Sequence, residues 1–140
     1  MIIIDTNVIS ELLRPNPEPA VEALLDSQDG LSIHLTATCE AELHYGVGIM
    51  TNGKRRDALA TAVDRILRED MTGRILPFDS AIARAYATIA ATHRTAGRPI
   101  AQADCQIAAI ALAHGAPVAT RNTPDFENCG VDLINPWTAA

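Results

Sequence analysis

The chain opens with Met1-Ile2-Ile3-Ile4-Asp5-Thr6-Asn7, a run of branched apolar residues that stops at a carboxylate, a hydroxyl and an amide. Consecutive branched residues without polar alternation are typical of a parallel strand that is covered on both faces. In an open α/β sheet, ligands bind just beyond the carboxyl ends of the strands, which is where Asp5 falls. A half-buried carboxylate there must be paired or bind a metal, unless Asp5 or Thr6 merely caps the next helix.

Strand and helix patterns alternate along the rest of the chain. Further strands are expected at residues 31–35, 74–78, 117–120 and 131–134, with a loop at 121–130. Helices are expected to begin after Asn7, at Pro19, at Thr36, after residues 54–56, at Asp79 or Ser80, and near Gln102. Pro77 favours an edge position for its strand, because proline cannot donate to the hydrogen-bond ladder. This alternation predicts an α/β fold with a mostly parallel sheet and helices on both of its faces.

Composition restricts the class of protein. The 140 residues are 48% hydrophobic and 20% charged, which is ordinary for one globular domain. A net charge of −6 argues against binding nucleic acid through a broad basic surface, and the few aromatic residues leave little for stacking on bases. Three cysteines without a CxxC pair disfavour disulfides or zinc and suggest a reducing compartment. Without an apolar run of ~18 residues we expect no membrane span and a cytoplasmic protein.

Four acidic residues fall at one edge of the predicted sheet. Asp5 follows the first strand, Glu42 lies on the helix after the second, Asp104 is in the first turn of a helix, and Asp125 follows the 117–120 strand. Carboxylates that are brought together repel one another, and a purely structural protein gains nothing from that arrangement. Oxygen ligands without histidine or cysteine suit Mg²⁺ or Mn²⁺, and phosphodiester hydrolysis is a common use of such a site.

Each of these acids taken alone also has an ordinary structural explanation. Asp104 stands where a helix dipole favours an anion by roughly 0.3–1 kcal/mol, Asp125 suits a turn, and Glu42 suits a solvated helix face. Other enzyme classes match less well. A haloacid-dehalogenase-type phosphatase needs a second aspartate where this chain has Asn7, a receiver domain needs an acidic neighbour beside Asp5, and a dinucleotide-binding fold needs a glycine fingerprint that is missing.

Several stretches, in order along nearly the whole chain, carry the motifs of a known family. They are Ile4-Asp5-Thr6-Asn7-Val8-Ile9-Ser10-Glu11-Leu12, Ala41-Glu42-Leu43-His44-Tyr45-Gly46, Arg74-Ile75-Leu76-Pro77-Phe78-Asp79, Gly97-Arg98-Pro99-Ile100 with Ala103-Asp104, Ile107-Ala108-Ala109, Thr120-Arg121-Asn122 with Asp125-Phe126, and Asn135-Pro136-Trp137. With these motifs the chain resembles PIN-domain ribonucleases of the VapC toxin type, in the FitB-like or plasmid-stability subgroup. The resemblance implies a single PIN domain over residues 1–140, with a three-layer α/β/α fold and about five strands.

The resemblance also implies a ligand set for a divalent metal. The family's metal ligands match Asp5, Glu42 and Asp104, and a fourth acidic position matches Asp125. Relatives often have a carboxylate where this chain has Asn122, so this amide is expected to act through a water. The expected cofactor is Mg²⁺ or Mn²⁺, and the expected reaction is hydrolysis of RNA phosphodiester bonds by a metal-activated water.

Supporting roles are implied for residues around these ligands. Thr120 and Thr6 match hydroxyl positions that hold the site together, and Arg98 and Arg121 are candidate phosphate contacts. One departure from the family is Ala101-Gln102, where relatives often have Ser-Glu before the aspartate. The departure removes an accessory charge and leaves the three main acids intact.

The implied biological role is that of the toxin in a type II toxin–antitoxin system. Its partners would be an RNA substrate, a cognate antitoxin that covers the site, and a second copy in a homodimer, with heterotetramers or larger assemblies when the antitoxin is bound. The alternative hypothesis is a catalytically silent PIN fold that acts only by binding a protein partner.

Overall fold

Five parallel strands form the centre of the computed structural model, which describes residues 1–139. In sheet order the strands are β3 (Ile75–Leu76), β2 (Ile33–Thr36), β1 (Ile2–Ile4), β4 (Val118–Ala119) and β5 (Leu133–Ile134). Every neighbouring pair is parallel. The predicted sheet is therefore confirmed, and so is the edge position of the strand before Pro77.

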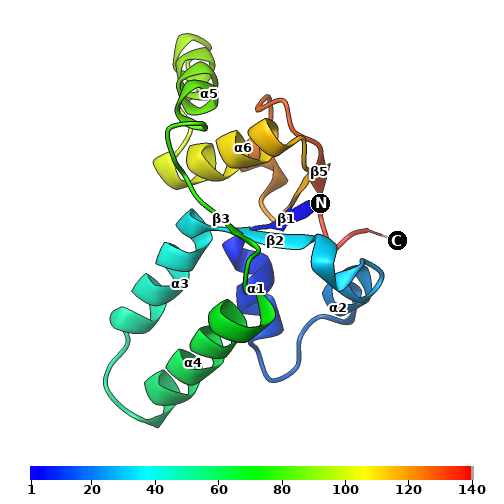
Figure 1. Ribbon diagram of the computed structural model, residues 1–140, viewed down its shortest axis with the longest axis vertical. Coiled ribbons are helices and arrows are strands. Elements are labelled where there is room, and N and C mark those ends of the chain that lie inside the picture. The colour runs from blue at the N-terminus through cyan, green and yellow to red at the C-terminus, as the bar shows by residue number, and fades with distance from the viewer. Residues whose placement is uncertain (140) are drawn as a thin grey trace.

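Helices cover both faces of this sheet. They are α1 (Thr6–Leu12), α2 (Pro19–Asp26), α3 (Ala37–Gly48), α4 (Lys54–Arg65), α5 (Ala83–Thr95) and α6 (Gln102–His114). Figure 1 shows α5 and α6 on one side of the sheet and α1 to α4 on the other, which is the predicted α/β/α arrangement. Within residues 1–139, no helix is long and apolar enough to cross a bilayer.

The central strand and α6 supply much of the core. Ile2, Ile3 and Ile4 are at most 3% exposed, because β1 has neighbours on both edges and helices on both faces. Helix α6 buries the continuous run Ile107–Ala111. Small alanine side chains let the helix approach the sheet closely, and burial of each large apolar side chain contributes about 1.5–3 kcal/mol. Both elements are thus fixed firmly, and each carries an acid of the candidate site at its end.

Some predicted boundaries are wrong. Asp79 and Ser80 do not cap α5, which begins at Ala83. The Asp79 carboxylate instead accepts the Ala81 N–H at 3.1 Å, and Ile82 N–H bonds to the Asp79 carbonyl at 3.0 Å. These bonds close a tight turn ahead of the helix. A capped turn and a capped helix begin with the same residue types, so the sequence pattern could not separate them.

Three other segments differ from their expected form. Gly30–Ser32 is a 3-10 turn, so β2 begins at Ile33 and continues to Thr36. The predicted 121–130 loop contains a 3-10 helix, η3 (Thr123–Phe126), which carries Asp125. Helix α4 gives way to a π-helical turn at Ile66–Asp70.

The strand order places a topological switch point between β1 and β4. The chain moves outward on one side from β1 to β2 and β3, then crosses back through α5 and α6 to β4 on the other side of β1. Ligands of open α/β sheets bind in the crevice that such a reversal leaves at the carboxyl ends of the strands. Asp5 and Thr120 directly follow the two strands that border this crevice.

Candidate metal centre

Asp5 stands at the end of β1, only 6% exposed, with donors around both of its oxygens. Its Oδ1 accepts the Thr6 N–H at 2.7 Å and so caps α1, while Oδ2 accepts the Thr120 hydroxyl at 2.8 Å and the Asn7 amide at 3.2 Å. Burial raises the pKa of the carboxyl, against the lowering effect of these donors. The helix cap and the candidate ligand are therefore the same residue, and Asp5 also lines the cleft at the crevice.

Asn7 and Thr120 join the two strand ends into one unit. The Asn7 amide donates to the Thr120 hydroxyl at 3.2 Å, and its carbonyl oxygen accepts the Arg121 N–H at 3.2 Å. The Thr120 hydroxyl also accepts the Asn122 N–H at 3.1 Å. These bonds hold the segment after β4 against the start of α1, so Asp5 has little freedom to move. Asn122 contributes its backbone here, and its side chain lines the cleft beside Asp5.

Glu42 reaches Asp5 from α3. The Thr36 hydroxyl caps this helix by accepting the Cys39 N–H at 3.1 Å. Further along the helix, the exposed Glu42 carboxylate accepts the Thr6 hydroxyl at 2.9 Å. One ligand atom each from Asp5, Glu42 and Cys39 lies within 4.8 Å of the others. Burial raises the pKa of the Cys39 thiol to about 11, so this sulfur stays protonated and the carboxylates are the ligands on offer to a hard cation.

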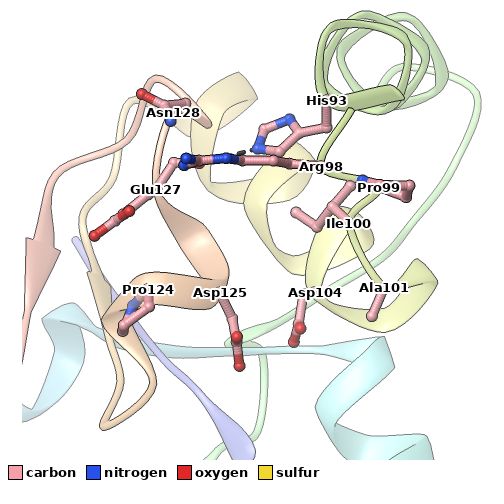
Figure 2. A pocket seen from close by; sticks show the side chains of 10 residues that line it. All are labelled: His93, Arg98, Pro99, Ile100, Ala101, Asp104, Pro124, Asp125, Glu127 and Asn128. Atoms are coloured by element: carbon pink, nitrogen blue, oxygen red, sulfur yellow. Dashed lines mark hydrogen bonds between the residues drawn. The ribbon is translucent and has the colours of Figure 1, made fainter. Parts of the chain in front are cut away.

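Asp104 and Asp125 face the same centre from the other side but stand outside that tight group. The pKa of Asp104 is raised to about 6. Burial is the main cause, and the negative charges of Asp5, Asp125 and Glu42 raise the pKa further. The dipole of α6, which we expected to favour the Asp104 anion, is therefore outweighed. Figure 2 shows the Asp104 and Asp125 side chains pointing the same way at one edge of a pocket. The structure thus brings all four predicted acids within electrostatic reach of one another.

The donor set fits a divalent cation that prefers oxygen. Within residues 1–139, the Asp104 carboxylate has neither a hydrogen bond nor an ion pair that would balance its charge. Repulsion among these carboxylates is a cost that a bound Mg²⁺ or Mn²⁺ would reverse, because the ion attracts all of them at once. Asp5, Glu42 and Asp104 are the residues placed to hold such an ion, with Asp125 beside them.

A cleft of about 580 Å³ opens over Asp5, Glu42 and Asp104 and contains two residues to which the sequence patterns gave no role in the site. Arg14 and Trp137 line it together with Arg121, whose guanidinium lies 5.0 Å from the centroid of the Trp137 ring. Arg98 lies instead in a neighbouring pocket with Asp104 and Asp125. The two predicted phosphate contacts therefore stand on different sides of the acid centre.

Glu11 also lines the cleft, and its carboxylate is already engaged. The side chain is 5% exposed, accepts the Glu18 N–H at 3.0 Å, and pairs with Arg14 through contacts of 3.0 and 3.1 Å. The Glu18 N–H first, and then the Arg14 guanidinium, lower the pKa of this carboxyl. We therefore assign Glu11 to holding Arg14 and the start of α2 rather than to a metal. The motif placed Glu11 near the site, but only the fold could show these partners.

The family of the chain follows from comparison with known proteins. Residues 2–130 match the model of the PIN domain. The chain is 45% identical to the VapC ribonuclease Y4jK of Sinorhizobium fredii over 140 residues, covering 100% of both chains, and 44% identical to the toxin FitB of Neisseria gonorrhoeae, covering 98% of this chain and 99% of FitB.

Solved structures agree with the sequence comparison. The fold resembles the crystal structure of FitAcB from Neisseria gonorrhoeae with a TM-score of 0.88 and 42% identity, covering 99% of this chain and 100% of that chain. The chain belongs to the PIN-domain family, and its similarity to a VapC ribonuclease and to FitB confirms the predicted subgroup.

Proposed function

We propose that this protein is the toxin of a type II toxin–antitoxin system and acts as a Mg²⁺-dependent endoribonuclease, with Mn²⁺ as a possible substitute. It hydrolyses RNA phosphodiester bonds in the cytoplasm and is neutralised by a cognate antitoxin. The relatives named VapC ribonuclease and toxin FitB support both parts of the proposal. The structural similarity to FitAcB supports a protein partner, and in the proposed assembly the antitoxin binds a homodimer of the toxin.

The observation that carries the nuclease proposal is the gathering of four carboxylates, those of Asp5, Glu42, Asp104 and Asp125, around two adjoining hollows that share Asp104. Burial and the three neighbouring carboxylates raise the pKa of Asp104 to about 6, and no hydrogen bond or ion pair of Asp104 within residues 1–139 offsets this cost. Perturbed carboxyls that gather in a cleft are typical of functional sites. The arrangement becomes favourable when a divalent cation is bound, and a bound Mg²⁺ would supply charge stabilisation at the phosphate.

The protein's own residues would position the ligands and the substrate. Thr120 and Asn7 fix Asp5, and Thr6 fixes Glu42, so these two carboxylates keep their orientation before any ion binds. Arg121 and Arg98 flank the acids and are the proposed contacts to RNA phosphates, because a planar guanidinium pairs well with anionic oxygens.

Cleavage of a mixed RNA pool that includes tRNA tests the proposal. Purified protein free of antitoxin would be assayed with Mg²⁺, with Mn²⁺ and with EDTA, alongside Asp5→Asn and Asp104→Asn. We expect discrete products that require a metal and that decrease by at least about 10²–10³-fold in both variants.

Glu42→Gln and Glu40→Gln form a matched pair for this experiment. Both residues lie on α3, but only Glu42 joins the acid group, so only Glu42→Gln should abolish cleavage. If the wild-type protein cut no RNA with any metal, or if the products persisted in both aspartate variants, the binding-only hypothesis would replace the nuclease.

A further inference from the structure

A second pocket adjoins the acid centre at Asp104 and Asp125. It has a volume of about 400 Å³ and lies between the end of α5, the connector at residues 97–101, the first turn of α6 and residues 124–128. Asp104 borders both this pocket and the larger cleft over Asp5. The pocket is therefore within reach of a nucleotide that neighbours a phosphate placed at the acids.

Arg98 gives the pocket a positive group. Figure 2 shows its side chain running across the pocket, on the opposite side from the carboxylates of Asp104 and Asp125. In the described part of the chain its guanidinium forms neither a salt bridge nor a hydrogen bond, so its donors are available to a ligand. An unpaired guanidinium beside a nuclease centre suits the phosphate of an adjacent nucleotide.

Asn128 gives the pocket a group that can read a base. At φ 63° it is the only non-glycine residue with positive φ among residues 1–139. Asparagine tolerates this left-handed conformation better than most residues, and the turn places its amide at the pocket wall in Figure 2. A carboxamide offers two donors and one acceptor, the combination that pairs with the edge of a base.

The backbone that carries Asn128 is fixed before any ligand binds. The buried His93 ring of α5 lies with Nε2 at 2.9 Å from the Glu127 carbonyl oxygen and Nδ1 at 2.9 Å from the Ile89 carbonyl oxygen. This contact ties the 124–128 segment to α5 across the pocket. Pro99, Ile100 and Pro124 add apolar walls against which a base can pack, and a volume of about 400 Å³ lies in the range of small-ligand sites.

From these contacts we propose that the pocket is a nucleotide subsite for the RNA residue next to the scissile phosphodiester. Arg98 binds a phosphate oxygen of that nucleotide, and the Asn128 amide hydrogen-bonds to the edge of its base. The subsite deepens the proposed ribonuclease function and rests on it. It also assigns part of the sequence preference to Asn128, a residue outside the motifs that identify the acids.

Two substitutions and one control test the subsite in cleavage assays read by sequencing of product ends. Asn128→Gly keeps the left-handed backbone and removes the amide, so we expect the ratio between preferred and disfavoured sites to fall about tenfold at one nucleotide position. Arg98→Gln should lower kcat/KM about tenfold, mainly through KM. Arg94→Gln removes a nearby charge on α5 outside the pocket and should change kcat/KM by less than about twofold.

Binding of the four nucleoside 5′-monophosphates, followed by amide NMR in EDTA, separates failure of the subsite from failure of the nuclease. We expect at least one nucleotide to shift the signals of Gly97, Arg98 and Asn128, and Arg98→Gln to weaken this binding. If the wild-type protein binds the nucleotide there but cuts no RNA, the pocket is a nucleotide-binding site, and the proposed ribonuclease function fails.

Other results overturn the subsite itself. These are nucleotide shifts confined to the Trp137 cleft, an unchanged cleavage profile in Asn128→Gly, or substitutions that weaken binding of an antitoxin peptide while leaving the RNA profile intact. The last result would assign the pocket to the protein partner.

Discussion

Burial raises the pKa of both Asp5 and Asp104, yet within residues 1–139 only Asp5 accepts hydrogen bonds. Asp5 is buried and accepts hydrogen bonds from Thr6, Thr120 and Asn7. Asp104 accepts none from residues 1–139, and burial with three neighbouring carboxylates raises its pKa to about 6. The fold itself therefore fixes Asp5, whereas in the proposed metal site Asp104 would gain a favourable partner from a cation. In that proposal the Asp5 side would position the ion, and the Asp104 side would make the site depend on metal.

Removal of the Thr120 hydroxyl is expected to change the stability of the protein more than any other substitution at this site. Thr120 is fully buried and bonds to Asp5, Asn7 and Asn122, so Thr120→Val leaves a buried carboxylate without its shortest side-chain donor. We expect a loss of about 2–3 kcal/mol in the free energy of unfolding, measured by urea denaturation in EDTA. Thr120→Ser keeps the hydroxyl and should lose much less. Equal losses for valine and serine would show that packing, not the hydrogen bond, is what Thr120 supplies.

The second prediction, for Asp104→Asn, is a gain in stability rather than a loss. Asp104→Asn removes the charge that burial and the other acids disfavour, so the metal-free protein should become more stable by on the order of 1–2 kcal/mol after allowance for solvent screening. The same variant should lose most of the stabilisation that Mg²⁺ gives to the wild-type protein. Thermal unfolding with and without Mg²⁺ measures both quantities.

Asp64→Asn, at an exposed position on α4, is the control for this second effect and should change neither quantity. A metal-free Asp104→Asn protein that is less stable than the wild type would mean that the carboxylate has a favourable partner in the fold.

The raised pKa of Asp104 also predicts that the stability of the metal-free protein depends on pH. Between the ordinary aspartate pKa of 3.8 and about 6, the folded state keeps a proton on Asp104 that the unfolded state has lost. Stability contributed by this group is therefore highest at low pH and falls as the pH rises through that window. The wild type should lose about 1 kcal/mol relative to Asp104→Asn between pH 5 and pH 7 in EDTA. If the stability of the two proteins changed in parallel with pH, Asp104 would not be the source of the pH dependence.

The sequence predicted the strands and helices that carry this site better than the side-chain contacts that support it. The apolar run before Asp5 and the periodic helices are local patterns, and the parallel sheet that they predict places the four acids at one edge. Asn7 meets Thr120 across 113 positions of sequence, and His93 meets Glu127 across 34, so neither pair leaves a local signal. The start of α5 was missed for a local reason, since Asp79 caps a turn with the same chemistry that caps a helix.

The smallest expected effect comes from Thr6, which donates to Glu42 at 2.9 Å just as Thr120 donates to Asp5 at 2.8 Å. Because Glu42 is exposed, water can replace the lost donor in Thr6→Val, and the free energy of unfolding should change by less than about 0.5 kcal/mol. Its orientation is nevertheless lost, so the affinity for Mn²⁺, measured by calorimetry, should fall by roughly up to tenfold, while Thr6→Ser keeps it. If Thr6→Val cost as much stability as Thr120→Val, burial would not be the property that separates the two sides of the acid centre.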